Sequence, residues 1–214
     1  MRDLIIIGAG GFGREAMEIA LDIQEDNPNI GWRMRGFITD IPGDFYDKNT
    51  LGYDIIDDIS HHEVQKNAVY VFAIADISFR ERMTKHFLNA GAKFVNLIHP
   101  SAIIGRTVVM GVGNIISPRV TITCNVDMGN FIRIGGGTSI GHDVKIGDYA
   151  TISGTCGING YAEIGRGAFV GSHGVICPHA VVGEYATVGT GSVVLRSVKP
   201  HISVYGNPAK KLNL

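Results

Sequence analysis

Large apolar residues recur at every sixth position through the second half of the chain. Counting from Ile98 in steps of six, seventeen consecutive positions as far as Val194 hold isoleucine, valine or methionine, and small or β-branched residues are common four places later. A period of six fits neither an α-helix nor an alternating strand. It is typical of a solenoid whose short strands stack coil upon coil around a narrow core. We therefore predict a parallel β-helix over residues 98–214.

Residues 1–97 show a different pattern, in which apolar runs alternate with helical segments. The first run ends at a glycine-rich turn, Gly8-x-Gly10-x-x-Gly13. The other expected elements are helices at about 14–23 and 78–89 and strands near 34–40 and 68–75. Such a turn lets a phosphate group approach the N-terminus of the following helix, although it can also be a simple strand-to-helix connection. We predict a small Rossmann-like α/β domain that binds a nucleotide at its strand ends.

Composition excludes several classes of function. The formal net charge is −1 and the pI is about 6.7, so the chain has no basic field that would attract nucleic acid. The sequence shows neither a signal peptide nor the 18 apolar residues of a membrane span, and we expect a cytoplasmic protein. The three cysteines form no CxxC pair, so neither a disulfide framework nor a zinc knuckle is expected.

Four features together resemble the bacterial sugar acetyltransferases of the sialic acid O-acetyltransferase type. They are the glycine-rich domain, the His99-Pro100 junction, the uninterrupted hexapeptide array and the tail VYGNPAKKL, and they span essentially the whole chain. This family includes acetyl-CoA-dependent N-acetyltransferases of UDP-4-amino-sugars. The resemblance implies a left-handed, triangular β-helix with 18 residues per coil. It also implies a homotrimer that binds acetyl-CoA between neighbouring solenoids.

The resemblance also points to a catalytic pair, His142 and Asp143. In the family, a histidine followed by an acidic residue supplies the general base and the carboxylate that orients it. The chemistry agrees, because an imidazole titrates near neutral pH and can accept the proton that an attacking amine or hydroxyl loses. An 18-residue coil stacks Gly160 on His142, and the family uses a backbone N–H there to stabilise the oxyanion. The alternative is that His142 is only an exposed corner residue.

Ligand contacts are expected from the same resemblance. The nucleotide-sugar would contact Gly10, Gly11, Phe12, Thr39, Asp40 and Ala75, and acetyl-CoA would contact Thr151, Ser172 and Thr190. Close relatives often carry a second histidine where Thr151 stands. The acceptor therefore stays open between the amine of a UDP-amino-sugar, which we expect for cell-surface glycan synthesis, and a sugar hydroxyl.

The remaining histidines and cysteines carry weaker expectations. We expect His99 to make a structural hydrogen bond, and we expect His61, His62, His86 and His201 to be exposed. Cys156 occupies a small inward position of the repeat, which favours direct transfer over a cysteine nucleophile. A zinc lyase of the carbonic anhydrase kind would need His142, His173 and His179 together. The coil spacing separates these three within one chain, so no metal is expected. A non-catalytic solenoid remains the other alternative.

Overall fold

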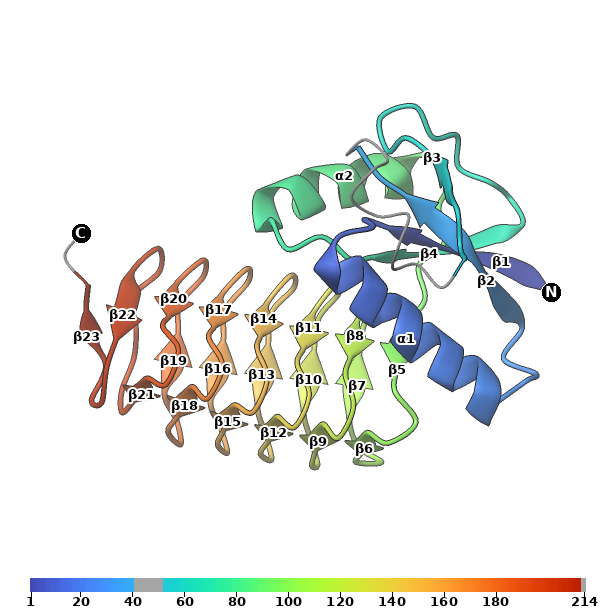
Figure 1. Cartoon of the computed structure of the whole chain (residues 1–214). Coiled ribbons are helices and arrows are strands. Elements are labelled where there is room, and N and C mark those ends of the chain that lie inside the picture. The colour runs from blue at the N-terminus through green and yellow to red at the C-terminus, as the bar shows by residue number, and fades with distance from the viewer. Residues whose placement is uncertain (41–51, 213–214) are drawn as a thin grey trace. The chain divides into compact units, whose positions relative to one another are not determined.

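The computed structural model describes residues 1–40 and 52–212. The chain divides into two compact units, Met1–Pro100 and Ser101–Leu214 (Figure 1). The first is an α/β domain and the second is a parallel β-helix, so the predicted fold class is confirmed.

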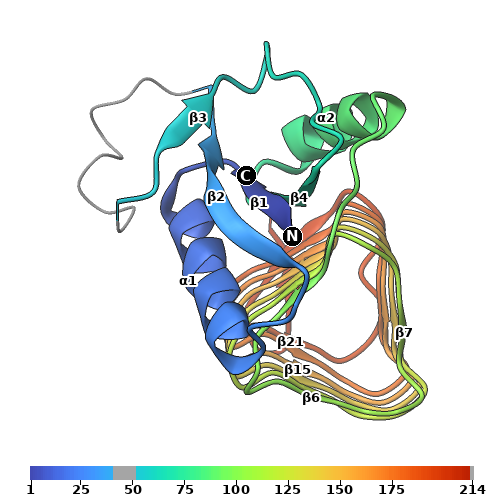
Figure 2. The same cartoon turned by 90° about the vertical axis from the view of Figure 1, so that its right-hand side faces the viewer.

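The N-terminal unit is built on a parallel sheet with the strand order β3-β2-β1-β4 among the described residues. Its strands are β1 (Arg2–Ile7), β2 (Trp32–Ile38), β3 (Ile55–Asp57) and β4 (Ala68–Phe72), and its helices are α1 (Gly11–Asp26) and α2 (Ile77–Asn89). The two helices lie on different sides of the sheet in both views (Figures 1 and 2). Because both faces are covered, residues 4–7 of β1 and all of β4 are buried, as is usual for parallel strands. β5 (Leu97–Ile98) follows at the end of this unit.

The solenoid consists of very short strands joined by tight corners. They are β6 (Ile103–Ile104), β7 (Val109–Met110), β8 (Ile115–Ile116), β9 (Thr121–Ile122), β10 (Asp127–Met128), β11 (Arg133–Ile134), β12 (Ser139–Ile140), β13 (Lys145–Ile146), β14 (Thr151–Ile152), β15 (Gly157–Ile158), β16 (Glu163–Ile164), β17 (Phe169–Val170), β18 (Val175–Ile176), β19 (Val181–Val182), β20 (Thr187–Val188), β21 (Val193–Val194), β22 (Ser203–Tyr205) and β23 (Lys210–Lys211).

The strand register shows that one coil takes 18 residues. Ile140 pairs with Ile122 in the preceding coil and with Ile158 in the following one. Successive strands fall in turn on three parallel sheets, which Figure 2 shows as the three sides of the coil. The last strand, β23, pairs antiparallel with β22.

The large apolar residues at every sixth position form the core of the solenoid. Ile140, Ile158 and Ile176 are at most 1% exposed, and each such side chain contributes about 1.5–3 kcal/mol on burial. Small residues complete the core, and Cys156 is among them at 3% exposure. Because the core is formed by inward-facing residues, side chains at the corners are not needed for packing and can take part in binding or catalysis.

Many of those corner residues have a left-handed backbone. Asn125, Asp143, Tyr161 and His179 lie 18 residues apart and have φ values of 56°, 58°, 59° and 61°. They belong to one corner, which we call the His142 corner and define as residues 124–125, 142–143, 160–161 and 178–179. Side chains there project from the coils and stack along the solenoid axis.

Candidate active site

His142 and Asp143 form a hydrogen-bonded pair at the corner that follows β12. His142 Nδ1 lies 2.8 Å from Asp143 Oδ2, and the two side chains are 54% and 32% exposed. An ionised carboxylate can only accept a hydrogen bond, so Nδ1 carries the proton and donates it. Nε2 is then left with a free lone pair, which is what a general base requires.

Several hydrogen bonds hold Asp143 in its ionised form. The hydrogen bond from His142 is the main cause that lowers the pKa of the Asp143 carboxyl, and a hydrogen bond from Asn125 contributes in the same direction against the effect of burial. The Asn125 Nδ2 atom lies 3.4 Å from Asp143 Oδ1. Asp143 therefore stays negative at neutral pH.

Gly160 lies one coil beyond His142 and leaves room for the imidazole. A Cβ atom at position 160 would lie 2.7 Å from Cε1 and 2.8 Å from Nε2 of His142. Glycine is thus required sterically, because any side chain would displace the ring. The neighbouring N–H of Tyr161 donates to the His142 carbonyl at 3.0 Å. The structure therefore brings His142, Asp143 and Gly160 together.

The six residues predicted to contact a nucleotide-sugar all line one pocket in the N-terminal unit. Its volume is about 400 Å³, and its lining is Gly8, Ala9, Gly10, Gly11, Phe12, Thr39, Asp40, Ala73, Ile74, Ala75, Asp76 and Phe79. The pocket lies where β1, β2 and β4 end, which is the usual ligand side of a parallel sheet.

The pocket also contains the start of α1. The helix begins at Gly11, its N-cap Gly10 makes no side-chain hydrogen bond, and its first turn has no acidic residue. Uncapped N–H groups at such a position favour an anion. Gly13 allows the close turn, because a Cβ there would collide with the Gly8 carbonyl oxygen. Gly11 is less constrained, since a Cβ there meets only the end of Arg14, at 4.0 Å.

The residues predicted to bind acetyl-CoA lie elsewhere in the solenoid. Thr151 is in β14, half a coil from His142 and on the sheet opposite the His142 corner. Ser172 and Thr190 are stacked one coil apart at a different corner, between β17 and β18 and after β20. A single chain therefore does not bring these three residues to His142.

Comparison with known proteins supports the same family. The PglD N-terminal domain family matches residues 3–87. A GDP-perosamine N-acetyltransferase from Escherichia coli O157:H7 is 30% identical over 127 residues, which is 59% of this chain and 56% of that protein.

Two solved structures match over almost the full length. The acetyltransferase domain of PglB from Neisseria gonorrhoeae FA1090, in complex with acetyl coenzyme A, superposes with a TM-score of 0.87 at 23% identity, covering 99% of each chain. PerB from Caulobacter crescentus, in complex with CoA and GDP-perosamine, has a TM-score of 0.85 at 24% identity and covers 99% of this chain and 97% of its own. The chain thus has the fold of these acetyltransferases, and its residues 3–87 match the PglD N-terminal domain family. The match to the curated relative spans only about half of that relative's length.

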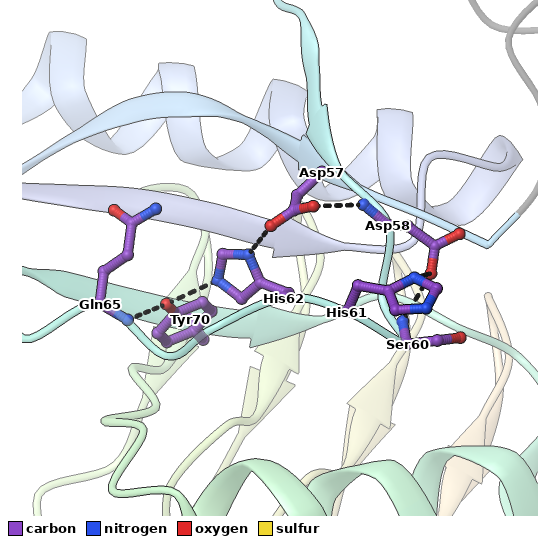
Figure 3. Close-up of polar contacts among 7 residues, drawn as sticks. All are labelled: Asp57, Asp58, Ser60, His61, His62, Gln65 and Tyr70. Atoms are coloured by element: carbon purple, nitrogen blue, oxygen red, sulfur yellow. Dashed lines mark hydrogen bonds and ion pairs between the residues drawn. The ribbon is translucent and has the colours of Figure 1, made fainter.

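One prediction about the histidines was wrong: His62 is not exposed. It is 7% exposed and lies in a hydrogen-bonded network (Figure 3). Its Nδ1 lies 2.8 Å from Asp57 Oδ2 and its Nε2 lies 3.0 Å from the hydroxyl of Tyr70, which also accepts the N–H of Gln65 at 2.9 Å. The hydrogen bond from His62 lowers the pKa of Asp57. His62 is buried because its partners come from β3 and β4, which the local sequence does not reveal.

Asp76 also lines this pocket, although it was not among the predicted contact residues. Its side chain caps α2 by accepting the N–H of Phe79 at 2.6 Å, and both residues line the pocket. The signal was available, since an aspartate that directly follows an apolar strand and precedes a helix is a typical N-cap.

Within the part of the chain that the structure describes, the other histidines do not gather into a metal site. The Tyr161 ring lies between His142 and His179, and His173 lies at the same corner as Ser172. No group of three potential ligands occurs within residues 1–40 and 52–212. His99 makes the predicted structural contact, with its Nε2 at 2.9 Å from Asp22 Oδ2.

Cys156 is a core residue of the solenoid. Burial raises the pKa of its thiol, and its Sγ lies 3.2 Å from the Gly171 carbonyl oxygen. A buried thiol with a raised pKa is a poor nucleophile.

No helix in the described part of the chain is both long and apolar enough to cross a membrane.

Proposed function

We propose that the protein transfers the acetyl group of acetyl-CoA to a nucleotide-activated sugar, with the amine of an amino-sugar as acceptor. The observation that carries this proposal is the His142–Asp143 pair packed against Gly160. The names of the relatives support it, because one is a GDP-perosamine N-acetyltransferase and another is an acetyltransferase domain with bound acetyl-CoA.

The proposed reaction is a direct transfer. The sugar nitrogen attacks the thioester carbon, a C–N bond forms, and His142 Nε2 takes the proton that the nitrogen loses. The Gly160 N–H donates to the oxyanion of the tetrahedral intermediate. Among the described residues this N–H donates to no other group. When the C–S bond breaks, the imidazolium returns its proton to the sulfur of CoA.

The nucleotide-sugar is proposed to bind in the pocket of the N-terminal unit. The uncapped start of α1 suits a diphosphate, and Thr39 and Asp40 supply polar groups at the rim. One relative is solved with GDP-perosamine, whereas the sequence resemblance points to UDP-amino-sugars, so the base stays open between guanine and uracil.

Acetyl-CoA is proposed to bind across two chains of a homotrimer. Thr151, Ser172 and Thr190 lie away from the His142 corner of their own chain, so only a neighbouring copy could combine them with that histidine. Sedimentation velocity at working concentration should show a trimer, and a stable monomer with full activity would contradict this arrangement.

We place the reaction in the cytoplasm, on a route to cell-surface glycans, because both proposed substrates are activated metabolites of that compartment. Cell fractionation with an antibody against the chain should recover it in the cytoplasmic fraction. Recovery in the membrane fraction after a high-salt wash would contradict this placement.

The acceptor can be identified by a thiol-release assay. Purified protein with acetyl-CoA is tested against UDP- and GDP-amino-sugars, CMP-sialic acid and free sugars, and each product is analysed by mass spectrometry. We expect release only with a nucleotide amino-sugar and acetylation at nitrogen. Acetylation at oxygen would instead support the hydroxyl acceptor, and no release with any acceptor would favour a non-catalytic solenoid.

A further inference from the structure

The left-handed positions of the His142 corner carry side chains that touch from coil to coil. Asn125 contacts Asp143, and the Tyr161 ring stacks on the His179 ring with centroids 4.9 Å apart and planes 2° apart. Asn125, Asp143, Tyr161 and His179 form a column of side chains at this corner, and Asp143 belongs both to the column and to the catalytic pair.

Tyr161 connects this column to His142. Its ring meets the imidazole edge to face, with centroids 5.2 Å apart and an interplanar angle of 88°. Tyr161 also makes the smallest contribution to the lowered pKa of the Asp143 carboxyl. The imidazole is therefore held from three directions, by Asp143 at Nδ1, by the backbone of Gly160 and by the Tyr161 ring.

A single hydrogen bond does not fix the orientation of an exposed ring. The His142 side chain is 54% exposed, so the hydrogen bond from Nδ1 to Asp143 allows it to tilt about that contact. The Tyr161 ring blocks one direction of tilt. Stacking on His179 in turn limits the movement of the tyrosine, which is itself 50% exposed.

We propose that Tyr161 is a positioning residue for the general base, and that its ring, supported by His179, keeps His142 Nε2 aimed at the substrate. The inference depends on the proposed function, because it assigns a role in the same reaction. It predicts that the ring matters more than the hydroxyl. Misplacing a catalytic group by about 1 Å can cost on the order of 100-fold in rate.

The test compares Tyr161→Asn, Tyr161→Phe and a matched control. Asparagine tolerates the left-handed backbone and already occupies the same corner position two coils earlier as Asn125, so the fold should survive the loss of the ring. The control is Tyr185→Asn, because Tyr185 has a φ of 53° and stacks on His201 at 5.3 Å, but belongs to another corner.

We expect Tyr161→Asn to lower kcat about 10-fold or more without changing the KM for acetyl-CoA or the Tm. Tyr161→Phe, which keeps the ring, should restore kcat to within about threefold of the wild type, a loss no larger than one neutral hydrogen bond. Tyr185→Asn should match the wild type.

The inference is overturned if Tyr161→Asn keeps its kcat, if Tyr161→Phe is as impaired as Tyr161→Asn, or if the control loses as much. His142→Ala is measured in the same assay. If His142→Ala also retains its turnover, the proposed general base is wrong. If His142→Ala is inactive while Tyr161→Asn is fully active, the general base stands and the proposed role of Tyr161 is wrong.

Discussion

The solenoid and the α/β domain build their candidate sites in different ways. In the solenoid, residues that meet are separated by one coil, so the contact between His142 and Gly160 follows from a count of 18. In the α/β domain, Gly11, Thr39 and Ala75 meet in one pocket although no repeat relates them. The first site depends on register and the second on topology. Substitutions should therefore separate chemistry at the solenoid corner from acceptor binding in the pocket.

The largest effect is expected from His142→Ala. If the solenoid corner performs the chemistry, kcat should fall by about 10²–10⁴, the usual contribution of a general base. The half-exposed side chain adds little to the core, so the Tm and the affinity for acetyl-CoA measured by calorimetry should be kept. His61→Ala is the control, since the His61 side chain is 85% exposed in the other unit. Near wild-type turnover of His142→Ala would contradict the mechanism.

Gly160→Ala tests whether catalysis needs a residue without a side chain next to the His142 ring. The new methyl group would meet the imidazole at 2.7–2.8 Å and push it aside, so kcat should fall by about 100-fold while the protein stays folded. Gly157→Ala is the matched control in the same coil, because a Cβ there meets nothing within 4 Å. Equal activity of the two variants would show that the contact is irrelevant to catalysis.

Asp143→Asn removes the charge but keeps the shape of the partner. The loss of kcat should be smaller, about 10- to 100-fold, as for one charge-assisted hydrogen bond. The acid limb of the kcat/KM profile should move to lower pH. The sign follows because the imidazolium loses a negative neighbour and forms less readily, so the active neutral ring persists to lower pH. A shift to higher pH would show that Asp143 is not the partner of the base.

The smallest effects are expected in the pocket of the α/β domain. Asp40→Ala should weaken sugar-nucleotide binding by about 3- to 10-fold through the loss of a polar contact. Gly11→Leu should obstruct the pocket without disturbing the helix, since position 11 has room for a Cβ. Calorimetry should show unchanged affinity for acetyl-CoA in both variants, with Asp26→Ala at the far end of α1 as control. Parallel loss of both ligands in a folded protein would refute the division between the units.

The sequence predicted most of the solenoid and only part of the α/β domain. Counting in steps of six correctly assigned every large apolar residue from Ile116 to Val194 to the core of the solenoid. Counting one coil of 18 residues also predicted that Gly160 stacks on His142. The short strand β3 and the burial of His62 could not be predicted, because they depend on partners that only the fold brings near. The contacts of Tyr161 with His142 and His179 were not predicted either. The apolar repeat fixes which residues point inward, but it does not show which outward side chains touch.

The position of the His142–Asp143 pair within the solenoid has a consequence for how the protein unfolds. A solenoid is nearly one-dimensional, so each coil is stabilised only by its two neighbours and the coils at the ends open first. β12, which precedes His142, has neighbours on both sides, with β6 and β9 before it and β15, β18 and β21 after it. Hydrogen exchange should therefore be fast around β22 and β23 and slow around β12. Partial unfolding from the C-terminal end would leave the histidine and its carboxylate assembled until the coil of Tyr161 opens.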